Sequence, residues 1–166
     1  EFAVDPLDVL QAGAVMTKNP DTLPGSMSVA EAVTFFSTLA RHRSYPVVGP
    51  GGHLLGVVSR SDALAWRQNS ALSAATLADT LSDSSHPVVH PDTPCSLVAD
   101  TIVQTGFGRI PVIARSTGIV VGLISRQDLL TARLAHRRQE TDRHRSVPKI
   151  RRDRSDAPRG GRTRLP

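Results

Sequence analysis

One phrase of this sequence is written twice. GVVSRSDAL at residues 56–64 returns as GLISRQDLL at residues 122–130, which is 66 positions later. A second matching pair lies ahead of it, because SYPVV at residues 44–48 resembles RIPVI at residues 109–113. Two copies of one unit within 166 residues predict two small, similar domains that fold together.

Each copy has the hydrophobic pattern of a helix, two strands and a second helix. Apolar residues recur every three or four positions in residues 28–43 and 96–106, which is typical of a helix with one buried face. The two short apolar runs that follow are separated by a turn rich in Gly, Ser or Thr, as in a β-hairpin. The next helix begins inside the repeated phrase.

The size of the unit determines how the copies must pack. A sheet of so few strands cannot bury both of its faces alone, whereas two copies packed sheet to sheet can. We therefore predict an α/β (α+β) fold of two repeats related by a pseudo-two-fold axis, each with a small β-sheet and two helices. We place the first repeat at residues 10–70, the second at residues 74–136, and a basic, flexible tail at residues 137–166.

The tail differs from the rest of the chain in charge. From Arg133 onward there are 12 Lys and Arg against 4 Asp and Glu, whereas residues 1–132 hold 8 basic and 11 acidic residues. From about Glu140 the chain is also poor in apolar residues and cannot offset its ordering entropy, so we expect it to be flexible, with at most a turn or two of helix. Because the folded part is mildly acidic, the sequence argues against a folded nucleic-acid-binding surface.

Other features of the composition indicate the compartment. Cys95 is the one cysteine, so no disulfide forms within the chain, and a reducing, cytoplasmic setting is expected. No apolar run approaches the roughly 20 residues of a membrane helix, and the first residues do not resemble a signal peptide. Since the chain begins with Glu1 rather than Met, we expect it to be part of a longer protein.

The repeated phrase has a purely structural explanation. Ser59 with Asp62, and Ser125 with Asp128, fit the capping box of a helix N-terminus. In this box the Ser hydroxyl accepts a hydrogen bond from a first-turn amide, and the acid reaches back to the cap. On this interpretation each repeat begins the same helix, and no ligand is involved.

The same geometry also suits a nucleotide. Amides at a helix N-terminus attract a phosphate, Arg60 and Arg126 add positive charge, and Asp62 and Asp128 can accept from the two hydroxyls of a ribose. Apolar walls for a flat base are expected from the preceding strands, through Tyr45, Pro46 and Val47 in the first copy and Ile110, Pro111 and Val112 in the second. The capping and the ligand interpretations both remain open at this point.

The tandem arrangement closely resembles a pair of CBS domains. The resemblance covers residues 10–136 and includes VMTKNPDTL at residues 15–23, the SYPVV and RIPVI strands and both repeated phrases. It implies that the Asp of each phrase binds ribose and that the preceding Ser contacts the nucleotide. The second lead-in, TLSDSSHPVV, departs from the family pattern, which puts its base pocket in doubt.

The resemblance also implies a role. CBS pairs sense AMP, ADP, ATP or S-adenosylmethionine, and many associate as homodimers. The ligand of this chain is then expected to be an adenine nucleotide, and the module is expected to regulate a partner rather than to catalyse a reaction.

A further resemblance concerns the parent protein. The end of the second copy, VVGLISRQDLLTARLAHRRQETDRHR, looks like the carboxyl terminus of bacterial ClC-type chloride channels and transporters. This implies an upstream transmembrane transport domain in the same parent chain, regulated from the cytoplasmic side of the inner (plasma) membrane. The alternatives are a CBS-pair sensor or dimerisation module that stands alone or is attached elsewhere, and a nucleic-acid-associated protein that acts through its Arg-rich tail. We expect no specific nucleic-acid partner.

No catalytic or metal site is expected. The six histidines show no ligand spacing with Cys95 or with paired acids. Ser59 and Ser125 lack a neighbouring base and the G-x-S-x-G elbow of a nucleophile. We therefore expect neither an enzyme nor a resident cofactor.

Overall fold

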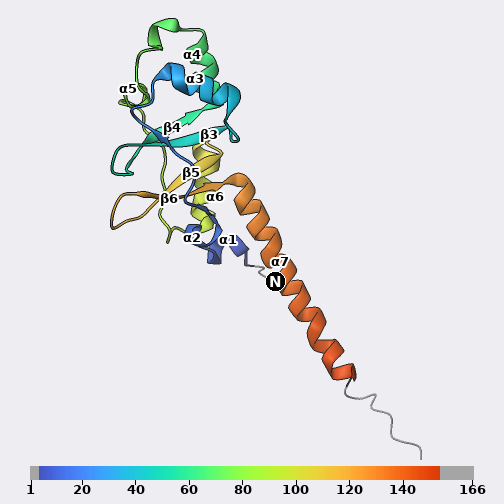
Figure 1. Ribbon diagram of the computed structural model, residues 1–166. Helices are drawn as coiled ribbons and strands as arrows, with labels where there is room; N and C mark the ends of the chain where they lie inside the picture. Colours follow the sequence, from blue (N-terminus) through green and yellow to red (C-terminus); the bar gives the residue numbers. More distant parts are fainter. Residues whose placement is uncertain (1–3, 154–166) are drawn as a thin grey trace, which may run out of the picture.

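The computed structural model describes residues 4–153, with side chains as far as residue 143. Figure 1 shows two lobes, one for each repeat, with the two sheets in the middle and helices on the outer sides. The elements in chain order are α1 (Pro6–Val9), α2 (Ala12–Val15), β1 (Thr17–Lys18), β2 (Leu23–Pro24), α3 (Val29–Thr38), β3 (Ser44–Val48), β4 (Leu54–Ser59), α4 (Arg60–Arg67), a 3₁₀ turn (Ser70–Leu72), α5 (Leu77–Thr80), α6 (Cys95–Thr105), β5 (Arg109–Ile113), β6 (Val120–Ser125) and α7 (Arg126–Asp153). The predicted mixed α/β fold with two small sheets is confirmed.

Each repeat contributes one hairpin to its own sheet. β3 pairs antiparallel with β4, and β5 pairs antiparallel with β6. In both hairpins the serine that ends the second strand lies opposite the first residue of the other strand, so Ser59 is opposite Ser44 and Ser125 is opposite Arg109. The two halves of the repeated sequence therefore adopt the same register.

The lead-in strands connect the two repeats. β2 joins the first sheet, parallel to β3, whereas β1 from the same lead-in pairs antiparallel with β6 of the second repeat. The second lead-in contributes the bridge between Val89 and Val112, which is the counterpart of the pairing between Leu23 and Val47. The amino-terminal lead-in therefore belongs to both sheets, which the repeat alone does not show.

Each repeat has its own hydrophobic core between its sheet and its helices. The first contains Leu23, Ala32, Phe36, Tyr45, Val47, Val58, Ala63 and Leu77. The second contains Leu7, Ala12, Val89, Cys95, Val98, Ile102, Ile110, Val112, Ile124 and Leu129. Because Leu7 and Ala12 come from α1 and α2, the amino-terminal segment packs on the second repeat even though it precedes the first in sequence.

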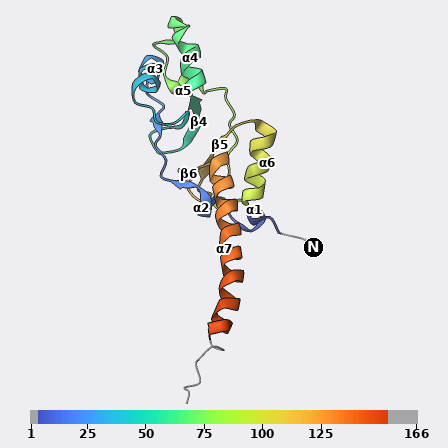
Figure 2. The ribbon, with the colours of Figure 1, turned by 90° about the vertical axis from the view of Figure 1, so that its right-hand side faces the viewer.

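The carboxyl-terminal helix is longer than expected. α7 continues to Asp153, whereas the sequence predicted a flexible segment from about Glu140 with one or two turns of helix. Arg, Gln and Glu are good helix formers, and His136 and Glu140 form an i,i+4 pair across 3.9 Å. Figures 1 and 2 show α7 leaving the second repeat and projecting away from both lobes. Residues 154–166 of the predicted tail lie outside the described residues, and no helix within residues 4–153 is both long and apolar enough to span a bilayer.

An ion pair joins the amino-terminal segment to this helix. Two nitrogens of Arg133 in α7 donate to the two carboxylate oxygens of Asp5, at 3.2 and 2.8 Å. Asp5 also caps α1, because its Oδ1 accepts from the amide of Leu7 at 3.1 Å. The Leu7 hydrogen bond and then the Arg133 guanidinium lower the pKa of Asp5 below its ordinary value of 3.8, against a raising effect of burial.

This pair predicts a pH-dependent contribution to stability. A carboxyl whose pKa is lowered by folding stabilises the protein above the unfolded pKa, and this contribution is lost as the pH falls through the folded value. We expect Asp5→Asn to lower the melting temperature at pH 7 and the difference from the wild type to shrink below about pH 4. Arg133→Gln is the matched control. It retains the Leu7 hydrogen bond, which lowers the pKa most, and should show a smaller pH-dependent difference. A difference that stays constant between pH 7 and pH 3 would contradict this account.

Candidate functional site

The repeated phrases form the predicted capping boxes. At the start of α4, Oδ2 of Asp62 accepts from the amide of Ser59 at 2.8 Å and from its hydroxyl at 3.0 Å, while the Ser59 hydroxyl oxygen accepts from the amide of Asp62 at 3.2 Å. At the start of α7, Oδ2 of Asp128 accepts from the amide of Ser125 at 2.9 Å, and the Ser125 hydroxyl accepts from the amide of Asp128 at 3.1 Å. Both repeated phrases therefore form the helix caps that the structural interpretation predicted.

The caps leave room for a ligand on each carboxylate. Both boxes use Oδ2, and within the described part of the chain Oδ1 of Asp62 and of Asp128 has no hydrogen-bond partner. A carboxylate oxygen held in place by a cap is suited to accept hydrogen bonds from a diol. Capping and ligand binding are therefore compatible functions of the same side chain.

The helix amides offer less to a phosphate than the sequence suggested. The amide of Arg60 donates to the carbonyl of Arg43 at 2.7 Å, and the amide of Arg126 donates to the carbonyl of Gly108 at 3.1 Å. Together with the caps, these bonds occupy two of the first three amides of each helix. A phosphate at either helix would have to be bound mainly by side chains.

Each capping box opens into a cleft between the two repeats. The Asp62 cleft has a volume of about 760 Å³ and the Asp128 cleft about 360 Å³, which are within the usual range of small-molecule sites. The Asp62 cleft is lined by Arg43, Ser44, Val57, Ser59, Arg60, Ser61, Asp62, Leu64, His86, Gly106, Phe107, Gly108 and Arg109. The Asp128 cleft is lined by Thr17, Asn19, Pro20, Asp21, His42, Ser44, Tyr45, Arg109, Leu123, Ser125, Gln127 and Asp128.

A third cavity lies elsewhere. It has a volume of about 650 Å³ and lies beside β2 and the turn between β3 and β4. Its lining contains neither repeated phrase and no charged side chain, and it includes Gly25, Val48, Pro50 and Leu55. Its polar side chains are Ser and Thr hydroxyls, so it lacks the cationic groups that would bind a phosphate and the carboxylate that would bind a ribose diol.

The predicted apolar walls mostly lie in the core instead. Pro46, Val47, Ile110, Pro111 and Val112 are fully buried and line neither cleft. Tyr45 is also buried, but its edge lines the Asp128 cleft. Arg126 is exposed and lies outside the lining of its cleft, where Gln127 takes its place. The predicted wall residues therefore lie in β3 and β5, where they are buried, and only Tyr45 reaches a cleft.

The residues that do form the apolar walls are Val57 and Leu123. They lie two positions before Ser59 and Ser125, and side chains at i and i+2 of a strand point to the same face. This alternation was visible in the repeated phrase and would have identified both residues.

Each cleft also contains a pair of flat rings that the sequence analysis missed. In the Asp62 cleft the ring centroids of His86 and Phe107 are 4.2 Å apart, and at the Asp128 cleft those of His42 and Tyr45 are 5.6 Å apart. Burial lowers the pKa of His86 below its ordinary value of 6.5, so the ring is neutral at pH 7. His42 and Phe107 lie 65 positions apart, which is the offset of the SYPVV and RIPVI strands. The offset therefore could have indicated from the sequence that these two residues occupy equivalent places in the two repeats.

The Tyr45 hydroxyl organises the loop that leads into β3. It accepts from the amide of Arg41 at 2.9 Å and from the amide of His42 at 3.1 Å. The ring meanwhile contacts Phe35 and Phe36 edge to face. Tyr45 therefore positions the loop beside both clefts as well as filling the first core.

Removal of this hydroxyl should be costly. Tyr45→Phe keeps the ring contacts but leaves two backbone amides without their acceptor, so we expect the free energy of unfolding to fall by about 1–2 kcal/mol. Urea denaturation at equilibrium measures this directly. A variant as stable as the wild type would show that water replaces the hydroxyl at no cost.

The described residues contain no cluster of metal ligands. No group of three or more His, Cys, Asp or Glu side chains is arranged to hold a metal ion in that part of the chain. Cys95 is buried, and burial raises the pKa of its thiol, which keeps it protonated at neutral pH.

Comparisons with known proteins identify the family of the chain. The CBS domain family matches the chain twice, at residues 12–69 and 79–135. A comparison with the curated proteins found no match.

Among solved structures, the chain is similar to CBSX2 in complex with AMP, with 26% identity, a TM-score of 0.66 and coverage of 77% of this chain and 98% of that one. It is also similar to the CBS-pair protein CBSX2 from Arabidopsis thaliana, with 25% identity, a TM-score of 0.67 and coverage of 78% and 97%. The CBS domain pair of protein MJ0100, in complex with 5′-methylthioadenosine and S-adenosyl-L-methionine, shares the fold at 19% identity and a TM-score of 0.60, with coverage of 73% and 93%.

The two family matches together cover more than half of the chain, and each contains one hairpin and one capping box. The chain is therefore a member of the CBS domain family and contains two CBS domains in tandem.

Proposed function

We propose that this CBS pair is a regulatory domain that binds an adenine nucleotide in a cleft between its repeats. The observation that carries the proposal is the pair of clefts, each with a capped aspartate, a serine, an apolar wall and two flat rings. The capped aspartate suits a ribose diol, the apolar wall and the rings suit a flat base, and the arginines that line the Asp62 cleft suit a phosphate. CBSX2, which is similar to this chain at 26% identity, was solved in complex with AMP. The proposed role is regulation of a partner rather than catalysis.

The location of the clefts suggests how binding is transmitted. Each cleft is lined by residues of both repeats, so a ligand contacts both and stabilises one arrangement of the pair over others. α7 and the amino-terminal segment both leave from the second repeat and are joined by Asp5 and Arg133. A change in that repeat would therefore reach both ends of the domain.

A thermal-shift titration with AMP, ADP, ATP and S-adenosylmethionine tests the proposal. A ligand at 100 times its dissociation constant should stabilise the fold by about 2.7 kcal/mol. GTP, offered at the same concentrations, is the control for non-specific anion binding. If no adenine ligand shifts the transition, or GTP shifts it equally, the nucleotide proposal is wrong and the clefts are structural.

We also propose that the domain is the cytoplasmic part of a ClC-type chloride channel or transporter in the inner membrane. The resemblance of the second copy and its basic helix to that carboxyl terminus supports this. A specific observation favours the alternative of a stand-alone CBS-pair sensor, because the match covers 98% of the CBSX2 chain. The sequence encoded upstream of Glu1 decides between them, since the first attachment requires a series of apolar helices.

A homodimer is part of the same proposal. Leu64 in α4 and Leu130 in α7 occupy equivalent places in the two repeated phrases and are 54% and 50% exposed. Exposed leucines at matching positions of the two repeats suit apolar contacts with a second copy. Light scattering coupled to size exclusion should give twice the mass of the chain, and Leu64→Glu should restore the monomer.

A further inference from the structure

The two clefts carry opposite net charges. The Asp62 cleft is lined by three arginines and one aspartate, a formal charge of +2, and the Asp128 cleft by one arginine and two aspartates, a formal charge of −1, with histidine counted as neutral. We propose that the two clefts divide adenosine ligands by charge. The Asp62 cleft binds a nucleotide with a polyphosphate chain, and the Asp128 cleft binds an uncharged or cationic adenosine derivative. This inference rests on the proposed function and adds a ligand class to each cleft.

The asymmetry originates where the chain enters β3 and β5. At the 65-residue offset that relates these strands, the counterpart of Arg43 is Gly108 and the counterpart of Ser44 is Arg109. Arg43 and Arg109 both line the Asp62 cleft, one from each repeat. Of these four residues, Ser44 and Arg109 also line the Asp128 cleft, whereas Arg43 and Gly108 do not, and Asp21 adds a second carboxylate there. The fold is repeated, but the charges are not.

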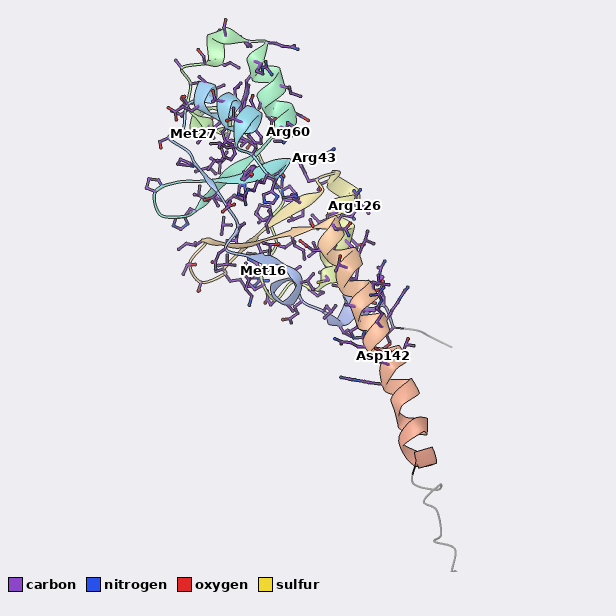
Figure 3. The ribbon with its side chains drawn as sticks, turned by 45° about the vertical axis from the view of Figure 1, so that its right-hand side comes forward. Met16, Met27, Arg43, Arg60, Arg126 and Asp142 are labelled. Carbon is purple, nitrogen blue, oxygen red and sulfur yellow. The ribbon has the colours of Figure 1, made fainter. Side chains whose placement is uncertain are left out.

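The arginines of the Asp62 cleft are available to a ligand. Within residues 4–143, the ion pairs are Asp92 with Arg115, Asp5 with Arg133 and His136 with Glu140, and none of these involves the cleft. The hydrogen bond from the Arg60 amide to the Arg43 carbonyl keeps two of the three arginine backbones next to each other. Figure 3 shows Arg43 and Arg60 together where the first repeat faces the second, and Arg126 at the beginning of α7. Guanidinium groups from several elements around one cavity suit a chain of phosphates.

The base-binding groups are alike in the two clefts, so the charge is what distinguishes them. Each cleft has a capped aspartate, a serine and a pair of rings, which suits the same adenosine moiety. The Asp62 cleft is about twice as large, 760 against 360 Å³, and has room for a longer substituent on the ribose. A phosphate chain in the Asp128 cleft would instead meet Asp21 and Asp128.

The experiment compares three ligands on the whole chain by isothermal titration calorimetry. ATP is the polyanion, S-adenosylmethionine carries a sulfonium cation, and 5′-methylthioadenosine is uncharged. Arg43→Gln should weaken ATP binding about tenfold or more, because it removes a charge-assisted contact, and should leave 5′-methylthioadenosine unaffected. Asp21→Asn is the matched control, since it neutralises one exposed residue of the other cleft. It should weaken S-adenosylmethionine severalfold and leave ATP unchanged.

Competition provides a second readout. Saturating S-adenosylmethionine should leave most of the ATP binding intact, because its sulfonium cation favours the negatively charged Asp128 cleft and disfavours the positively charged Asp62 cleft. The division by charge is wrong, while nucleotide binding stands, if the competitor displaces ATP. It is also wrong if the affinity for ATP is unchanged in Arg43→Gln or falls in Asp21→Asn. If none of the three ligands binds the wild-type chain, the division and the proposed function are both wrong. Unliganded melting temperatures of both variants show that a loss of binding is not a loss of fold.

Discussion

Replacing Gly122 with alanine is expected to lower the free energy of unfolding by roughly 1–3 kcal/mol, the cost of overpacking a filled site. The added Cβ would contact Met16 and come within 3.1 Å of the Thr17 carbonyl oxygen. Met16 can move its side chain, but the Thr17 carbonyl belongs to β1, which pairs with β6 at this point. The substitution would therefore push apart the strands that join the two repeats.

Equilibrium urea denaturation of Gly122→Ala measures the loss. Gly108→Ala is the matched control, because a Cβ at Gly108 has no neighbour within 4 Å and its backbone conformation is not left-handed. We expect the control to stay within roughly 0.5 kcal/mol of the wild type. If Gly122→Ala is equally stable, β1 does not lie across this glycine in solution.

Asp62→Ala is expected to remove the stabilisation by nucleotide at its cleft, which is about 2.7 kcal/mol at 100 times the dissociation constant. The variant also loses the hydrogen bonds of Asp62 to Ser59, so we expect the unliganded protein to be less stable by about 1 kcal/mol. These two effects must be separated, because a damaged cap by itself changes the melting temperature.

The chain contains a suitable control for this experiment. Thr76 and Asp79 form the same reciprocal box at the start of α5, and Asp79 lines neither the Asp62 cleft nor the Asp128 cleft. Asp79→Ala should therefore lower the unliganded melting temperature and retain the full shift with ATP. If Asp62→Ala also retains the full shift, Asp62 only caps its helix and the ribose role is wrong.

Local features were well predicted because they depend on neighbouring residues. The capping boxes of Ser59 with Asp62 and Ser125 with Asp128 form as expected. Gly106 ends α6 in the left-handed conformation, with φ of 77°, which few residues other than glycine adopt readily. The equal registers of the two hairpins also follow from the repeated strands.

The walls of the clefts were predicted less well because they depend on which face of each hairpin is covered. Val47 and Val112 were expected in the clefts and lie in the cores, whereas Val57 and Leu123 line the clefts. The apolar runs of β3 and β5 do not themselves indicate which face meets the other repeat. The signal lay in the next strands, where Val57 and Leu123 share a face with the capping serines.

The sequence by itself determined that the chain contains one unit twice and where the hairpins and the following helices begin. It also determined which carboxylates cap those helices. Each of these features depends on contacts within a few residues or on the repeat. Only the tertiary structure decided that β1 pairs with β6 rather than with its own repeat, and that Arg43 and Arg109, 66 positions apart, line one cleft. Those arrangements depend on how two sheets pack against each other, and the charge difference between the clefts becomes visible only once they have packed.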